Sequence, residues 1–458
     1  MKFRILLLTA LFVMPAIAAA QQDDGDPFEN NPLFNQPLND IFGDYNSADS
    51  NYDDLGYLHS TGLDYNGILE AGPYNSNSLY GQYPSLPMIH YNRVDALFLG
   101  VEKERMQWYD EAEFLGIPNF RPHGLIGYSF GLKELQYTAG VEKFIGKKNH
   151  IMVGTEYHSA TSTDDYWRVG LNETSLTAFS SGYDYLDYYK QRGWGTYLLF
   201  RTNRFFEGGL SYNDNEFSSL QTQSNWALLG TSGRFRPNPP VDMVNGISVD
   251  NIDVSSLSVN ASFNPKRLLL SRNFTFAANG TVEFGDPGIG VSDYSYTKYR
   301  AEISSFINFD EGSVFKYRFR AGSITGDAPA VKEFQLGGLG SLRALPYKSL
   351  PTGRLGDNQM LLSNAEVHFG APDFGADGWI DNDDFFISLF LDSGWTNFSS
   401  DLTESTNPFT GFSDFSFADL EHNGGFGFGS SLIRGELAWD LRNASQAPVF
   451  WLRFNPTF

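Results

Sequence analysis

The chain has 458 residues, a formal net charge of −22 at pH 7 and no cysteine. Without cysteine there are no disulfides and no thiolate metal sites, and we expect no lipid anchor on a cysteine. The acidic balance disfavours nucleic-acid partners. Aromatic residues make up 16% of the chain and charged residues only 19%, and no internal stretch approaches the ~18 apolar residues of a membrane helix. This composition is typical of a β-protein.

Residues 1–20 have the pattern of a secretory signal peptide. Lys2 and Arg4 precede a short apolar run, and three alanines at 18–20 provide a cleavage site. Residues 21–90 are acidic, rich in Asp and Asn, and lack a sustained period of 2 or 3.6 residues, so we predict a largely flexible segment. Scattered Phe, Tyr and Ile residues leave open a segment that docks inside the rest of the protein or meets a periplasmic partner.

From Tyr91 onward, segments of about ten residues alternate apolar and polar side chains between clusters of Gly, Asp and Asn. In "FKYRFR", residues 315–320, aromatic residues alternate with Lys and Arg. This pattern recurs in strand after strand without a second, buried layer. An all-β transmembrane antiparallel barrel over residues 91–458, with lipid outside and water inside, explains it better than a soluble sandwich.

Candidate strands begin near Tyr91, Arg121, Leu135, His150, Trp194, Phe206, Val249, Phe274, Tyr299, Phe315, Met360, Phe385, Gly425, Glu436 and Val449. Single-chain bacterial barrels have even strand counts. We therefore predict sixteen strands, with the missing strand in residues 226–235 or 158–192.

Two motifs fail the requirements of a catalytic or metal site. "GYSFG" (Gly127 to Gly131) fits the serine-hydrolase pattern, but Ser129 falls inside an alternating strand where a strand–turn–helix elbow is needed. "DGWIDNDD", residues 377–384, lacks the spacing of an EF-hand loop, and the seven histidines show no metal spacing. We predict no catalytic residue, no cofactor and no metal site.

Two strand segments place carboxylates on the face opposite their apolar residues. In "LLSNAEVHF" this residue is Glu366, and in "FFISLFLDSGW" Asp392 shares its face with Phe390 and Gly394. Both carboxylates are expected in the lumen, close together if the strands are neighbours. Such a pair favours a guanidinium partner, and Arg343 in the preceding Gly-rich loop is the obvious candidate. A solvated loop arginine is the alternative.

These segments resemble the BamA/TamA/FhaC superfamily of outer-membrane assembly and secretion barrels. "FQLGGLGSLRALPY" is similar to its Val-Arg-Gly-Phe/Tyr loop, and "LLSNAEVHF", "FLDSG", "GGFGFG" and a terminal Phe follow in the same order. "YNRVDALFLG" resembles the first strand of short members known as bacterial surface antigens. The resemblance covers most of Tyr91 to Phe458 and is specific from Phe334 onward.

The resemblance implies a sixteen-stranded barrel whose sixth extracellular loop folds inward. The implied site comprises the loop motif Gly340, Leu342, Arg343, Ala344 and Leu345, the lumenal partners Glu366 and Asp392, and the Phe-x-Asp-x-Gly motif Phe390, Asp392 and Gly394. Ala344 and Leu345 stand where the superfamily has Gly and an aromatic residue. Because Gly permits backbone angles that Ala avoids, this loop tip could turn differently.

The chain ends in "APVFWLRFNPTF", which predicts a final strand running to the last residue. By the resemblance, Phe454 and Phe458 on its apolar face form an assembly signal. Pro456 cannot donate a backbone hydrogen bond. We therefore predict a weak seam between the first and last strands.

We predict a non-enzymatic barrel in the outer membrane of a Gram-negative bacterium that assists insertion or translocation of proteins, or lipids, through this seam. Expected partners are the lipid bilayer, client outer-membrane proteins and a periplasmic or lipoprotein partner. Residues 21–90 lack the pattern of the superfamily's periplasmic β-α-β-β (POTRA) modules, so we expect these to be absent. Their absence leaves open a passive channel or structural surface barrel without insertase activity.

Overall fold

The computed structural model describes residues 86–454 except 104–112, 115–116, 119, 146–150, 202–204, 230–234, 265–269, 271–273, 311–312, 352, 371–384, 431–432 and 444. The predicted signal peptide lies outside the described residues, as does the predicted flexible segment up to residue 85.

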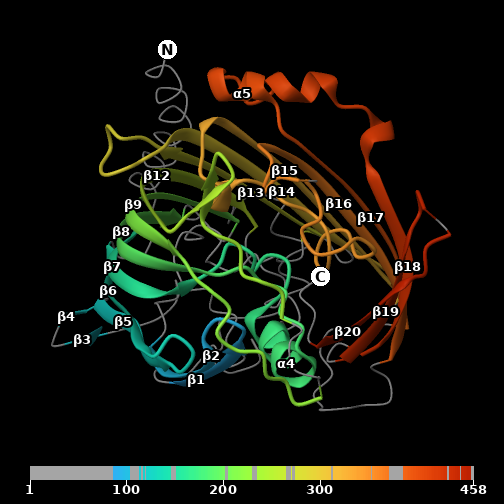
Figure 1. Cartoon of the computed structure of the whole chain (residues 1–458), viewed down its shortest axis with the longest axis horizontal. Coiled ribbons are helices and arrows are strands. Elements are labelled where there is room, and N and C mark those ends of the chain that lie inside the picture. The colour runs from blue at the N-terminus through green and yellow to red at the C-terminus, as the bar shows by residue number, and fades with distance from the viewer. Residues whose placement is uncertain are drawn as a thin grey trace, which may run out of the picture.

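One antiparallel sheet of sixteen strands dominates the fold, and each strand pairs with the next one along the chain (Figure 1). The strands are β1 (Leu86–Asn92), β2 (Ala96–Lys103), β5 (Phe120–Ser129), β6 (Glu134–Ile145), β7 (Ile151–Ser162), β8 (Tyr189–Arg201), β9 (Phe206–Ser219), β12 (Asn251–Phe263), β13 (Phe274–Gly285), β14 (Ser295–Asp310), β15 (Ser313–Asp327), β16 (Gln359–Phe369), β17 (Phe386–Asn397), β18 (Glu421–Gly429), β19 (Ile433–Asp440) and β20 (Val449–Phe454). The all-β class and the count of sixteen are confirmed.

Smaller elements lie in the connections. They are the hairpins β3 (Glu113–Phe114) with β4 (Ile117–Pro118) and β10 (Asp242–Val244) with β11 (Ile247–Val249), the helices α4 (Leu171–Ser181) and α5 (Ser400–Glu404), and the 3-10 turns η3 (Ala330–Lys332), η5 (Thr410–Asp414) and η6 (Phe417–Asp419). Among the described residues, no helix combines the length and the apolar character needed to cross a membrane.

The strand that the sequence missed lies at the start of the sheet. Residues 91–100, interpreted as one strand, contain a hairpin turn between β1 and β2. The Asn92 side chain accepts hydrogen bonds from the backbone N–H groups of Val94 (2.8 Å) and Asp95 (2.6 Å), which closes the turn. The first strand therefore begins at Leu86, ahead of the predicted boundary at Tyr91.

Neither segment chosen for the missing strand contains it. Residues 158–192 hold the end of β7, helix α4 and the start of β8, and the described part of 226–235 carries no strand.

The two faces of the sheet are reversed relative to a soluble protein. On β17, Ile387, Leu389 and Leu391 are 58%, 53% and 47% exposed, whereas Phe390 and Asp392, which alternate with them, are buried. On β15 the inward residues are Lys316, Arg318 and Arg320, all buried. Apolar side chains outside and charged ones inside are the pattern of a membrane barrel wall.

Three long connections have described parts that pack inside the wall. They are residues 163–188 between β7 and β8, residues 220–250 between β9 and β12, and residues 328–358 between β15 and β16. The last is the sixth connection at its end of the sheet, and we call it loop six. Its Leu336 and Leu342 are fully buried in an apolar core with Val254, Tyr296 and Leu362 of the wall. The lumen is therefore packed rather than open along this part of the chain.

The sheet stays open between its first and last strands. Within the described residues, no ladder of backbone hydrogen bonds joins β1 to β20. Helix α4 lies between the β1–β2 hairpin and β20 (Figure 1) and contacts both edge strands. We call the space between β1 and β20 the seam.

Candidate functional site: a buried arginine in the lumen

The backbone of loop six bends sharply because of its glycines. Gly337, Gly338 and Gly340 have φ angles of 115°, 82° and 73°, in the left-handed region that only glycine adopts easily. A Cβ on Gly340 would lie 2.2 Å from the carbonyl oxygen of Arg168 in the β7–β8 connection. Leu336 and Leu350 exchange two backbone hydrogen bonds, of 2.8 and 3.0 Å, which close the base of the bend. The bend carries Arg343 to the inner face of the wall.

Arg343 is 3% exposed and meets three carboxylates. Its Nε and Nη2 donate to the two oxygens of Asp392, both at 2.8 Å, which is a bidentate pair. Its Nη1 donates to Glu366 Oε1 at 2.7 Å and to Glu436 Oε2 at 3.4 Å. The guanidinium carbon lies 3.5 Å from the centre of the Phe390 ring. We call Arg343 and these three carboxylates the arginine cluster.

The wall presents the carboxylates from three strands. Glu366 lies on β16, Asp392 on β17 and Glu436 on β19. Register pairs Asn364 with Asp392 across β16 and β17. The Asn364 amide donates to Asp392 Oδ1 at 2.8 Å and to the carbonyl oxygen of Ser341 at 2.9 Å. The strand ladder and the Asn364 amide thereby fix the position of Asp392 beside the loop.

The two departures from the superfamily motif fit the lumen. Ala344 does not have a positive φ, so the loop turns here without requiring glycine. Its N–H donates to Asn423 Oδ1 at 3.0 Å, and its methyl group packs with Phe390 and Ala438. Leu345 is partly buried against the apolar core.

Gly394 of the Phe-x-Asp-x-Gly motif gives loop six its room. A Cβ at this position would lie 2.9 Å from Leu336 and 3.2 to 3.3 Å from Leu342. Any side chain on Gly394 would therefore push against the loop residues that pack beside Arg343.

Sequence reasoning missed the third carboxylate and two further arginines. Arg434 Nη2 lies 2.6 Å from Glu436 Oε1, and Arg453 Nη1 lies 3.8 Å from the same oxygen. Arg453 also contacts Glu173 of helix α4, at 3.0 Å. Alternation could have found them, since Arg434 and Glu436 oppose the outward Ile433 and Leu437. A continuous line of charges thus runs from Arg343 to the seam.

The cluster holds its charge against the cost of burial. Burial lowers the pKa of Arg343, but Asp392, Glu366 and Glu436 outweigh this and hold the pKa well above its usual range. A fully buried pair of this kind is costly to break, about 3–5 kcal/mol, because the remaining partner keeps an uncompensated charge.

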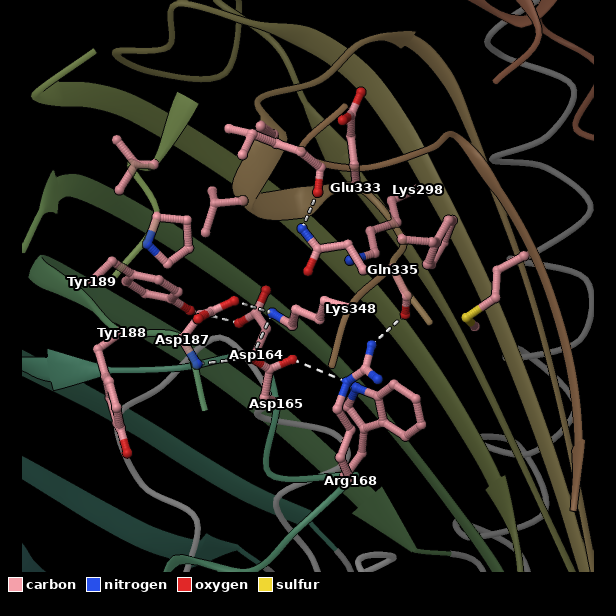
Figure 2. Close-up of a pocket in the computed structure, with 18 of the residues that line it drawn as sticks. Asp164, Asp165, Arg168, Asp187, Tyr188, Tyr189, Lys298, Glu333, Gln335 and Lys348 are labelled. Atoms are coloured by element: carbon pink, nitrogen blue, oxygen red, sulfur yellow. Dashed lines mark hydrogen bonds and ion pairs between the residues drawn. The ribbon is translucent and has the colours of Figure 1, made fainter. Parts of the chain in front are cut away.

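A second polar cluster surrounds a cavity of ≈ 80 Å³ between loop six, the β7–β8 connection and the wall. Figure 2 shows Asp165 and Asp187 approaching Lys348 of loop six, whose Nζ lies 2.6 and 2.9 Å from their carboxylates. Burial raises the pKa of the neighbouring Glu333 to about 7. The ion pairs of Lys348 with Asp165 and Asp187 hold loop six against the β7–β8 connection beside this cavity.

The remaining sequence candidates lie apart from this site. Ser129 sits in β5, where its Oγ accepts a hydrogen bond from the N–H of Leu132, with no strand–turn–helix elbow around it. Phe454 ends β20, whereas Pro456, Phe458 and residues 377–384 lie outside the described residues. In the described part of the chain, no group of His, Asp and Glu is arranged to hold a metal ion.

Solved structures of other proteins have a similar fold. BamA from Haemophilus ducreyi lacking POTRA domains 1–3 superposes with a TM-score of 0.51 at 13% identity, over 81% of this chain and 70% of that one. CdiB from Escherichia coli (TM-score 0.40, 13% identity) and CdiB from Acinetobacter baumannii (0.41, 10%) are also similar over 81% of this chain. The chain spans 62% and 59% of those two proteins.

No protein-family model and no curated protein matches the sequence. The fold is that of an outer-membrane β-barrel. Its strand arrangement is similar to that of the BamA barrel, so the fold that the motifs predicted is confirmed.

Proposed function

We propose that this protein assists the insertion or translocation of proteins at the outer membrane through the seam between β1 and β20. The open seam carries the proposal. An edge strand presents a row of N–H and C=O groups on which another strand can pair. Each of the sixteen strands pairs with its neighbours in chain order. Within the described residues, only β1 and β20 lack a backbone ladder between them, so the sheet is open there.

The arginine cluster supports the same proposal. Arg343 holds loop six against β16, β17 and β19, three strands joined through unbroken ladders from β16 to β19. The wall from β16 to β19 is therefore held rigidly, whereas the seam between β1 and β20 can open. We propose that the cluster keeps the lumen filled and the wall rigid while the seam opens.

The packed lumen disfavours the passive channel. Loop six and the β7–β8 connection meet inside the wall through Lys348, which bridges Asp165 and Asp187. A steady large conductance in planar bilayers would contradict the proposed function and favour the passive-channel hypothesis.

The proposal is tested by depleting the protein in its host and quantifying outer-membrane proteins. We expect a subset of them to decline, and an unchanged outer membrane would refute the role.

Because the chain has no cysteine, an engineered disulfide can lock the seam reversibly. Tyr91→Cys with Ser175→Cys joins β1 to α4, where the Tyr91 N–H and Ser175 Oγ lie 2.7 Å apart. The oxidised variant should fail to restore the depleted proteins, and the reduced variant should restore them.

The matched control is a crosslink where the sheet is already paired. Leu389 and Phe426 face each other across β17 and β18, so Leu389→Cys with Phe426→Cys should restore the depleted proteins in either redox state. If both oxidised pairs behave alike, seam opening has no part in the activity.

A further inference from the structure

Helix α4 has its polar and apolar faces reversed. Glu173, Thr174, Thr177 and Ala178 are buried, whereas Leu176 and Phe179 are 43% and 40% exposed. A surface helix of a soluble protein does the opposite, because its apolar stripe faces the core. The exposed stripe continues to Tyr183, which is 55% exposed.

Two hydroxyls of α4 bond to the helix itself. Thr177 Oγ1 donates to the carbonyl oxygen of Glu173 at 3.0 Å, and Ser181 Oγ donates to that of Thr177 at 2.9 Å. Such bonds satisfy polar groups without water, as helices surrounded by apolar material require. The helix ends at Gly182, which has a φ of 76° and donates its N–H to Ala178 O.

The contacts with β1 show which side of the wall α4 occupies. Tyr91 belongs to the outward face of β1, since it lies two residues from the outward Ile89 and pairs with the outward Leu97 of β2. Tyr91 is nevertheless only 8% exposed. The rings of Phe179 and Trp226 cover it, with centroids 5.8 and 6.2 Å away. Phe179 therefore lies on the outer side of the wall.

The same helix supplies partners to both edge strands. Ser175 Oγ accepts the N–H of Tyr91 on β1 at 2.7 Å, and Glu173 Oε1 accepts the N–H of Phe454 on β20 at 3.3 Å. Glu173 also forms a bidentate pair with Arg453, at 3.0 and 3.1 Å. Arg453 faces inward, between the outward Leu452 and the end of the strand. Side chains of α4 thus occupy positions that a neighbouring strand would fill.

We propose that α4 is a segment of the membrane wall that fills the seam, and that Leu176, Phe179 and Tyr183 form an interaction surface for lipid acyl chains. The two edge strands that α4 contacts carry outward apolar residues as well: Ile89 of β1 and Leu452 of β20 are 64% and 45% exposed. This inference concerns the location of the helix and stands independently of the proposed transport activity.

Spin labels on single cysteines test the location in the full-length protein reconstituted in phospholipid vesicles. Leu176→Cys and Phe179→Cys should carry nitroxides that collide readily with oxygen and poorly with a water-soluble nickel complex. Leu389→Cys on the outward face of β17 is the lipid control. Phe417→Cys in η6, where the phenylalanine is 80% exposed, is the aqueous control.

Collision profiles at 176 and 179 that match position 389 support the proposal. Profiles that match position 417 place the helix in water and overturn it. Low collision rates with both reagents indicate that a protein surface covers the helix, which also overturns it. Should a cysteine prevent folding, Leu176→Lys against Phe417→Lys replaces it: the lysine at 176 should lower the thermal unfolding midpoint more, and equal midpoints contradict the proposal.

Discussion

Two buried arginines, Arg343 and Arg453, hold loop segments in two different ways. Arg343 draws loop six onto carboxylates from three strands of one continuous ladder. Arg453 is itself on the last strand, and its closest carboxylate, Glu173, belongs to a helix in a connection. One side of the barrel is closed by backbone ladders and charge together, the other by side chains alone. The comparison indicates that the wall around Arg343 stays closed, whereas the contacts between α4 and β20 can be exchanged for those of another strand.

Removing Arg343 should have the largest effect on stability. Arg343→Ala leaves the buried Asp392 without its guanidinium and removes one cation beside Glu366 and Glu436, which should cost about 3–5 kcal/mol. Heat-modifiability on gels should show the folded band lost at a clearly lower temperature. Arg442→Ala is the control, because its pair with Glu421 is 41% and 25% exposed and is worth about 0–1 kcal/mol. Equal shifts for both variants would mean that the cluster does not stabilise the barrel.

The bend of loop six offers the second test. Gly340→Ala adds a Cβ that meets the Arg168 backbone, at a φ of 73° that alanine avoids. Strain and overlap should together cost about 2–4 kcal/mol. Gly353→Ala, with a φ of 78° and no atom within 4 Å of its Cβ, should cost only the strain. A thermal midpoint as high in Gly340→Ala as in Gly353→Ala would argue against close packing of the two loops.

The seam should respond differently from the wall. Glu173→Gln keeps a hydrogen-bonding group but removes the charge that pairs with Arg453, at a cost of about 1.5–3 kcal/mol. We expect the spin label at position 176 to become more mobile while labels on β17 do not change. Unaltered mobility at 176 would show that Glu173 does not hold α4 in place.

The smallest effect concerns Glu333 beside the polar cavity. Its pKa of about 7 in the folded protein is above the ordinary value, so the folded state binds this proton more strongly than the unfolded state. Stability should therefore fall as pH rises from about 4.5 to 7, by about 1 kcal/mol in all after solvent screening. Unfolding midpoints at several pH values should show that Glu333→Gln flattens this slope, and an identical slope would contradict the assignment.

Most of the fold could be predicted from the alternation of apolar and polar residues along the sequence. In a strand, a period of two residues directly sets which face each side chain occupies. It placed Glu366 and Asp392 on the lumenal face from their neighbours alone. The β1–β2 turn escaped it, since Asn92 and Asp95 look like polar positions of a continuing strand. Only the hydrogen bonds of the Asn92 side chain reveal the turn.

Helix α4 was missed for a different physical reason. Its sequence, LNETSLTAFSS, lies in a long connection and shows no apolar face suited to a protein core. Glu436 was overlooked as a partner of Arg343 because β19 is not adjacent to β17, and only the folded loop brings them together. Contacts made by loops depend on the whole wall, which local periodicity does not describe.

Helix α4 remains attached to β7 and β8 by both ends of the connection at residues 163–188. If the helix leaves the seam, these tethers keep it nearby at an effective concentration in the millimolar range. Reclosure is then an intramolecular event, independent of how many copies of the protein the membrane holds. The two edge strands would be available only to a competitor that binds them more strongly than this tethered helix.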